Sequence, residues 1–237
     1  MKKLSKGKFI VFEGLDGSGK STQAKLLVDY LKRNSYEVMT IDFPQHGEKS
    51  AGLVDNYLVG KYGSSEKVGP WRAAIFYAAD RYDASFKMKE WLKQGKIVVV
   101  DRYVGSNIGH QGGKIKNKKE RVKFIKWLYH LEYGIFKIPK PDISIILKTS
   151  PQLATKMAPK ITDKEKKKKR RVYLGKKTKD IHEEDLIHLS QTLNSYLEIA
   201  KEFPRDFKTI ECLENNKLLP PEIIHQKVIK TIRGTLK

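Results

Sequence analysis

The segment Phe12–Thr22, FEGLDGSGKST, constrains the fold of this chain more than any other stretch. It fits the pattern G-x-x-x-x-G-K-[ST], with an apolar run, KFIVF, before it and a helical pattern, KSTQAKLLVDYLKRN, after it. The glycines let successive N–H groups point inward at phosphate oxygens, and the helix beginning near Gly19 adds the positive end of its dipole. The sequence therefore predicts a strand, a phosphate-binding loop and a helix, in that order.

The loop supplies a backbone cradle and two polar side chains with separate tasks. We expect Lys20 to reach the β- and γ-phosphates of a nucleotide and the Ser21 hydroxyl to hold Mg²⁺, which makes ATP and Mg²⁺ the expected cofactors. The predicted nucleotide-binding residues are Gly14, Asp16, Gly17, Ser18, Gly19, Lys20, Ser21 and Thr22. The pattern differs from G-x-G-x-x-G, which disfavours a dinucleotide-binding fold.

Short apolar runs rich in β-branched residues alternate with longer helical patterns along the chain. The five runs expected to form strands are residues 8–14, 36–43, 96–101, 141–150 and 207–212. This alternation predicts a parallel sheet with helices on both faces. For 237 residues we expect a single α/β domain, 1–237, built on a five-stranded parallel sheet of the P-loop type.

The chain is strongly basic, with 48 Lys+Arg against 27 Asp+Glu and a net charge of +21. The lysines are spread from end to end, with one dense run, KEKKKKRR, and no recognised nucleic-acid module accompanies them. This distribution favours a solvated enzyme surface over nucleic-acid binding. One cysteine allows no disulfide framework and fits a cytoplasmic setting. Because no apolar run approaches about 18 residues, we expect no membrane partner.

The segment KIVVVDRY places Asp101 and Arg102 at the carboxyl end of a central predicted strand, where open α/β sheets bind ligands. Asp101 can serve Mg²⁺, directly or through water, and Arg102 can bind a phosphate through two N–H groups. The alternative is that Asp101 caps the next helix and pairs with Arg102. Beside a phosphate-binding loop we favour the functional interpretation.

The ordered set of motifs resembles the thymidylate kinase family of nucleoside monophosphate kinases. The matching segments are EGLDGSGKSTQ, DFPQHG, FYAADRY, DRYVGSN, KPDISIIL, a basic stretch and DIHEEDL, from about Phe9 to the final helix. The resemblance implies transfer of the γ-phosphate of ATP to dTMP, giving dTDP. It also implies a basic lid at about residues 158–180 and a homodimer that packs through helices near the acceptor site.

The resemblance also implies an acceptor pocket for dTMP. Asp16 would contact the sugar and phosphate region, and Phe43 and Pro44 would shape the pocket. Tyr77 would stack on the base while Arg81 donates to a carbonyl oxygen of thymine. The four-residue spacing places Tyr77 and Arg81 on one face of a helix. The alternative is that Tyr77 lies in the core and Arg81 pairs with an acidic residue.

The chain that follows DRY has three residues at positions that line the acceptor in the family, Ser106, Asn107 and His110. Arg102 is expected to contact the acceptor as well as to take part in catalysis. Ser106 and Asn107 would line the base and sugar. His110 stands where a tyrosine that crowds the sugar 2′ position is frequent, and it can fill similar space.

The lid is expected to deliver positive charge to the reacting phosphate. Family members without an arginine inside the phosphate-binding loop tend to supply arginines from the lid, and this loop has Gly17 after Asp16. The expected catalytic set is Lys20, Arg102, Arg170 and Arg171.

Two other functions stay open at this point. The residues Gln45, His46, Tyr77 and His110 depart from the family pattern, which permits a kinase for another nucleotide or nucleoside. A basic P-loop ATPase that binds nucleic acid is the second alternative, and it predicts steeply salt-dependent binding.

Overall fold

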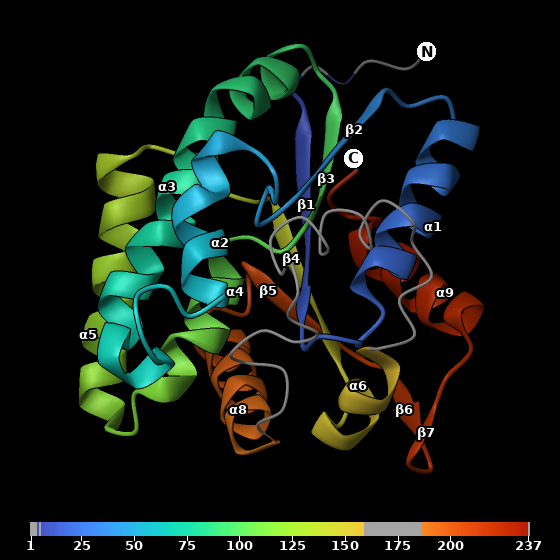
Figure 1. The fold of residues 1–237 in the computed structure, drawn as a ribbon. Coiled ribbons are helices and arrows are strands. Elements are labelled where there is room, and N and C mark those ends of the chain that lie inside the picture. Colours follow the sequence, from blue (N-terminus) through green and yellow to red (C-terminus); the bar gives the residue numbers. More distant parts are fainter. Residues whose placement is uncertain (1–3, 5, 159–185, 237) are drawn as a thin grey trace.

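The computed structural model describes residues 4, 6–158 and 186–236, and these form one layered α/β fold around a central sheet (Figure 1). The strands are β1 (Lys8–Gly14), β2 (Val38–Asp42), β3 (Ile97–Asp101), β4 (Ile143–Lys148) and β5 (Phe207–Glu211). They pair in the order β2-β3-β1-β4-β5, and every pair is parallel. The expected five-stranded parallel sheet is therefore confirmed.

Helices cover both faces of the sheet. Helices α1 (Lys20–Arg33) and α9 (Pro221–Ile232) pack on one face. The other face carries α3 (Ser65–Lys93), α4 (Val104–His110), α5 (Lys118–Tyr129) and α8 (Leu186–Glu202). Shorter elements are η1 (Lys49–Ala51), α2 (Gly52–Leu58), η2 (Gly112–Lys114), η3 (His130–Ile135) and α6 (Pro151–Met157). Among the described helices, none is long and apolar enough to cross a membrane.

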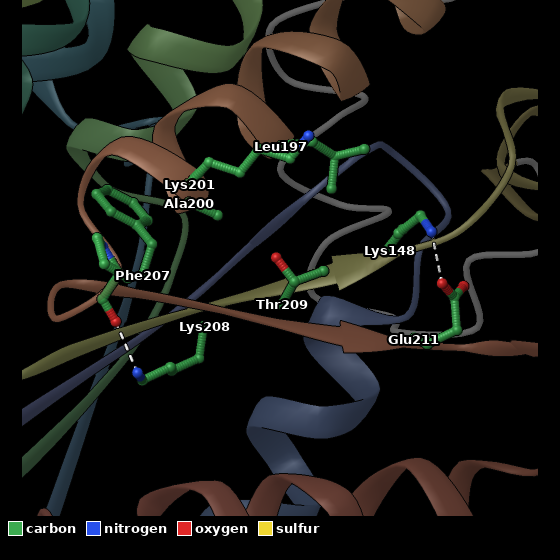
Figure 2. A pocket seen from close by; sticks show the side chains of 9 residues that line it. Lys148, Leu197, Ala200, Lys201, Phe207, Lys208, Thr209 and Glu211 are labelled. Carbon is green, nitrogen blue, oxygen red and sulfur yellow. Dashed lines mark hydrogen bonds and ion pairs between the residues drawn. The ribbon is translucent and has the colours of Figure 1, made fainter.

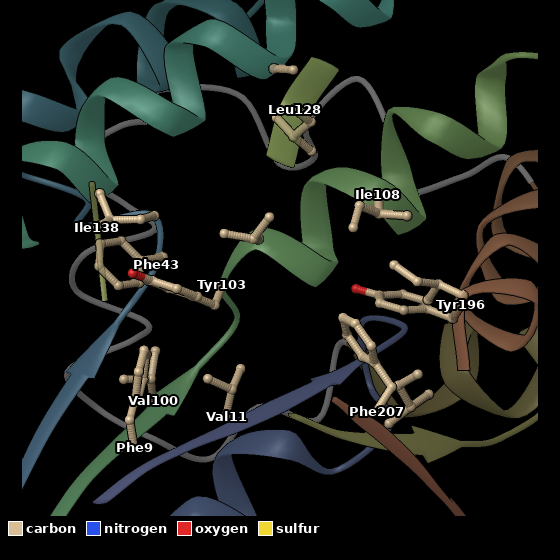
Figure 3. Close-up of a cluster of buried hydrophobic side chains, with 14 of the residues drawn as sticks. Phe9, Val11, Phe43, Val100, Tyr103, Ile108, Leu128, Ile138, Tyr196 and Phe207 are labelled. Atoms are coloured by element: carbon tan, nitrogen blue, oxygen red, sulfur yellow. The ribbon is translucent and has the colours of Figure 1, made fainter. Parts of the chain in front are cut away.

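The core has two halves, one on each face of the sheet. Successive residues of a strand point to opposite faces, so Phe9 and Val11 join one cluster while Ile10 and Phe12 join the other. Figure 3 shows the first half, where Phe9, Val11 and Val100 lie below Tyr103. Burial on both sides explains why these strands read as continuous apolar runs.

Helix α3 is broken near its start and then runs without interruption beside the sheet. Gly69 has φ 73 and ψ 161 inside the helix, and Pro70 follows it. Across this break, Arg72 donates from Nε to the carbonyl of Val68 at 2.5 Å and from Nη2 to that of Lys67 at 2.9 Å. Arg72 thereby satisfies carbonyl groups that the break leaves without helical partners.

The short helix α4, which the periodicity did not predict, packs closely against β1 and α8. A Cβ atom on Gly109 would lie 2.6 Å from the Tyr196 ring, and one on Gly105 would lie 2.7 Å from Glu13 Oε1. These two glycines therefore let α4 approach the end of β1 and the middle of α8 together. This packing holds the chain after β3 next to the phosphate-binding loop.

A small antiparallel hairpin, β6 (Leu213–Glu214) with β7 (Lys217–Leu218), was also not predicted. Its two turn residues, Asn215 and Asn216, have φ 48 and φ 60. Asparagine tolerates this left-handed conformation, which two-residue hairpin turns require.

Candidate active site

The loop between β1 and α1 holds the side chain of Lys20 inside its curve. Lys20 is 6% exposed, and its Nζ donates to the carbonyl oxygens of Gly14 at 3.1 Å and Leu15 at 2.7 Å. Gly19, with φ 89, stands at the start of α1 in the left-handed conformation. The ammonium group is thus buried beside the N-terminus of a helix, where phosphate oxygens are favoured.

Ser21 and Asp101 meet at the carboxyl end of the sheet. Ser21 Oγ donates to Asp101 Oδ2 at 2.9 Å, and β1 and β3 pair so that Phe12 stands opposite Asp101. Helix α4 begins after Tyr103 and has no side-chain cap, which excludes the alternative that Asp101 caps the next helix.

This oxygen pair fits Mg²⁺. The ion prefers one or two protein oxygens and takes its other ligands from phosphates and water. In the described part of the chain, no three His, Cys, Asp or Glu side chains cluster as a metal site. Ser21 and Asp101 could hold Mg²⁺ together with the phosphates of a nucleotide.

Arg102 lies at the centre of the polar cluster. Its φ is 70, a conformation that costs a non-glycine residue about 1–3 kcal/mol and tends to occur at functional sites. Nη2 pairs with Asp16 Oδ1, and Nη1 donates to Ser106 Oγ at 3.3 Å and to the Gly14 carbonyl at 3.4 Å. His110 Nε2 lies 3.2 Å from the same Nη1.

The ion pair between Asp16 and Arg102 keeps both groups charged. Desolvation alone would raise the pKa of Asp16, but the charges of Arg102 and Lys20 hold that pKa well below its usual value. Desolvation would also lower the pKa of Arg102, and Asp16 instead raises it. A substrate group that binds Asp16 or Arg102 must therefore replace the charged partner of that residue.

Glu13 is a fully buried carboxylate behind this cluster. Its Oε1 accepts from the Tyr103 backbone N–H at 3.0 Å, and its Oε2 accepts from Ser106 Oγ at 2.6 Å and Tyr196 OH at 3.2 Å. Burial raises the pKa of Glu13, while the Ser106 hydrogen bond and the Arg102 charge oppose that rise. Glu13 thus fixes the chain on the carboxyl side of Arg102 and joins it to α8. This role of Glu13 was not predicted from the sequence.

Gly17 leaves no room for a side chain in the loop. It has φ 81, and a Cβ atom there would lie 2.2 Å from the Ala154 carbonyl oxygen of α6. An arginine at this position would collide with α6. The lid residues expected to replace it, Arg170 and Arg171, lie outside the described residues, as does nearly all of the expected 158–180 lid.

The expected acceptor residues gather around α3 and α4. Tyr77 is half-buried, with its ring 6.4 Å from that of Tyr57, and Phe43 is buried 5.7 Å from the Tyr103 ring. Asn107 donates from Nδ2 to the Ala74 carbonyl at 3.0 Å. This amide therefore links α4 to α3.

The loop after β2, which contains Pro44, is held by acidic residues of the neighbouring helices. The backbone N–H of Gln45 donates to Asp80 Oδ2 at 2.9 Å, and its Nε2 donates to Asp80 Oδ1 at 3.1 Å. His46 Nδ1 lies 2.5 Å from Asp55 Oδ1. The two residues that depart from the family pattern here are thus anchored to α3 and α2.

Arg81 lies in a buried ion pair with an acidic residue, which is the alternative that the sequence left open. It is 2% exposed, and it donates from Nε to Glu132 Oε2 at 2.6 Å and from Nη2 to Glu132 Oε1 at 2.7 Å. Desolvation would lower the pKa of Arg81, but Glu132 raises it. Only the Nη1 side, 3.5 Å from the Tyr103 carbonyl, points away from Glu132.

A surface depression of about 560 Å³ lies away from the loop, between α8 and the edge strand β5 (Figure 2). Lys148 and Glu211, which pair at 2.6 Å, stand at one end, and Phe207 lies at the other. No residue of the phosphate-binding loop lines it.

The buried Arg81–Glu132 pair generates a stability prediction. Arg81→Ala leaves Glu132 uncompensated, and we expect the free energy of unfolding to fall by about 3–5 kcal/mol. The double variant Arg81→Ala/Glu132→Ala removes both charges and should lose less than the sum of the losses of the two single variants, Arg81→Ala and Glu132→Ala. Urea unfolding of all four proteins measures this. Additive losses in the double variant would contradict the assignment of a coupled pair.

Comparison with known proteins assigns the family. A family model described as thymidylate kinase matches residues 12–223. The thymidylate kinase of Rickettsia typhi is 30% identical over 227 residues, which cover 95% of this chain and 99% of that protein. The thymidylate kinase of Caldanaerobacter subterraneus is 29% identical over 233 residues, 98% of each chain.

Two further comparisons extend this result. The thymidylate kinase of Plasmodium falciparum is 36% identical over 149 residues, a match that spans 63% of this chain and 65% of that protein. A thymidylate kinase structure from Candida albicans aligns with a TM-score of 0.69 at 23% identity, covering 98% of this chain and 93% of that one, and it supports the fold. This chain belongs to the thymidylate kinase family.

Proposed function

We propose that the carboxyl ends of β1 and β3 form the site at which this chain transfers the γ-phosphate of ATP to dTMP, giving dTDP and ADP. The reaction is that of its family. The observation that carries the placement is the meeting of buried Lys20, the Ser21–Asp101 pair and Arg102 at one edge of the sheet. Phosphoryl transfer of this kind depends on positioning and charge stabilisation, and these groups supply both.

The donor nucleotide is assigned to the loop. Its backbone N–H groups and the start of α1 receive the phosphates, and Lys20 exchanges its carbonyl partners for the β- and γ-phosphate oxygens. Ser21 and Asp101 would hold Mg²⁺, which neutralises charge on the phosphates when bound.

Arg102 and Asp16 are assigned to the region where donor and acceptor meet. A dianionic phosphate can replace Asp16 as the partner of Arg102 through two parallel N–H contacts. Asp16 is then free to accept a hydrogen bond from the sugar. The strained backbone of Arg102 aims its side chain across the loop.

The acceptor base is assigned to the pocket beside α3. Tyr77 stacks on thymine, and Arg81 donates from Nη1 while Glu132 holds the rest of its guanidinium group. The residues proposed to complete the wall are Phe43, Pro44, Ser106, Asn107 and His110. Arg170 and Arg171 are proposed to supply lid charge to the transferring phosphate.

A coupled assay of ADP release tests this function. With Mg·ATP we expect release that depends on dTMP, and Lys20→Ala should lower kcat by about 10²–10³-fold because a preorganised cation at the transferring phosphate is lost. Lys25→Ala, on the exposed side of α1, is the matched control and should keep the rate.

The same assay decides between the alternatives. ADP release that depends on another monophosphate and not on dTMP would mean that the other monophosphate is the acceptor. Release stimulated by nucleic acid alone would overturn the proposal.

A homodimer is part of the proposal, and an exposed apolar face on α3 supports it. Trp71, Ile75, Tyr82 and Phe86, here called the α3 stripe, recur at helical spacing and are 37–60% exposed. Ile135 of η3 is 60% exposed, and its neighbour Phe136 packs on Tyr82 with ring centroids 4.9 Å apart. A contiguous patch of this kind on a helix is typical of a protein interface.

We expect the wild-type protein to sediment at twice the chain mass of 27.3 kDa. The double variant Ile75→Lys/Phe86→Lys should sediment as a monomer at micromolar concentration, because it places charges in the α3 stripe. Ile223→Lys, which changes an isoleucine of α9 that is 40% exposed, is the control and should remain a dimer. A wild-type monomer would contradict the dimer.

A cytoplasmic location belongs to the same proposal, supported by the nucleotide substrates and the single cysteine.

A further inference from the structure

His110 makes a contact that reports its protonation state. Its Nε2 lies 3.2 Å from Nη1 of Arg102. A guanidinium group carries only N–H donors, so the imidazole nitrogen that faces it must accept. In this arrangement His110 is neutral and carries its proton on Nδ1.

The groups around His110 come from three other elements. Helix α8 contributes His188, whose ring centroid is 5.8 Å away at an interplanar angle of 38°, and Tyr196, whose ring stands edge-on at 6.3 Å. The phosphate-binding loop contributes Asp16, which pairs with Arg102. Strand β1 contributes Glu13, which already accepts hydrogen bonds from Ser106 and Tyr196.

Protonation of His110 would change this arrangement in two ways. It would place an N–H donor against the donor of Arg102, and it would bring a second positive charge next to the guanidinium group. The two nearby carboxylates are already held by other partners, so they offset this repulsion only in part. Arg102 would lose one of its four contacts and be pushed away from His110.

We propose that neutral His110 positions Arg102 for phosphoryl transfer, and that protonation of His110 below neutral pH releases Arg102 and slows the reaction. His110 is thus a positioning residue that makes the rate sensitive to acid. The proposal rests on the assignment of Arg102 to the reacting phosphates.

The test is the pH dependence of kcat and of kcat/KM for dTMP from about pH 5.5 to 8.5, the interval in which histidine changes charge. We expect the wild-type kcat to fall severalfold between pH 8 and pH 5.5, because a growing fraction of His110 takes up a proton over this interval. In His110→Gln, whose side-chain oxygen can accept from Arg102 at any pH, the ratio of kcat at pH 8 to kcat at pH 5.5 should shrink severalfold.

His188→Gln is the matched control, since it removes the other histidine of the pair. It should keep the wild-type ratio. The phosphate of dTMP also titrates in this range, and it contributes equally to every variant. The proposal is overturned if His110→Gln keeps the wild-type ratio, or if His188→Gln alone abolishes the acid dependence.

A spectroscopic measurement tests the contact without turnover. In a long-range ¹H–¹⁵N spectrum, Nε2 of His110, assigned by its loss in His110→Gln, should be unprotonated at pH 8. In Arg102→Ala the titration midpoint of His110 should move to higher pH, because a neighbouring cation has been removed. An unchanged midpoint would contradict the contact. If dTMP-dependent ADP release is absent at pH 8 in the wild type, the proposed function fails, and this titration still decides the state of His110.

Discussion

The hydrogen bonds of the buried Glu13 carboxylate hold the two halves of the site together. One oxygen accepts from the backbone N–H of Tyr103, which follows β3. The other accepts from the hydroxyl groups of Ser106 in α4 and Tyr196 in α8. Burying a carboxylate destabilises the fold unless its oxygens accept hydrogen bonds. Moving any of its three donors away would therefore lower the stability of the protein. The phosphate-binding loop, the Arg102 segment and helix α8 therefore share one anchor.

This anchor explains how a strained residue can stay in its position. Arg102 has a positive φ, and such a conformation persists only where the surroundings determine it. The backbone N–H of Arg102 donates to Phe12 at 2.9 Å, and the next residue is held by Glu13. The chain on both sides of Arg102 is thus fixed to β1. Its side chain pairs with Asp16 and lies beside His110.

Local pattern in the sequence was enough to predict the sheet and the loop. Short apolar runs rich in β-branched residues identified all five strands of the main sheet, and the glycine spacing placed Lys20 and Ser21 at the start of α1. These features depend on neighbours within a few residues, which periodicity and turn chemistry record.

Pairings between distant residues were not predictable in this way. Glu132 is 51 residues from Arg81, and Tyr196 is 183 residues from Glu13, so no local pattern joins them. A charged residue inside an apolar strand, as in FIVFEG, was the one available signal for Glu13. The β6–β7 hairpin had a clearer signal in its two adjacent asparagines.

The most direct test of this anchoring is the kcat for dTMP of Glu13→Ala compared with Glu13→Gln, measured beside the affinity for ATP. Glutamine can still accept from Tyr103 and donate to Ser106, whereas alanine removes both contacts. We predict that Glu13→Ala loses at least about tenfold more kcat than Glu13→Gln while both remain folded and bind ATP within about threefold of each other. Equal kcat values in the two folded variants would contradict the central role of Glu13.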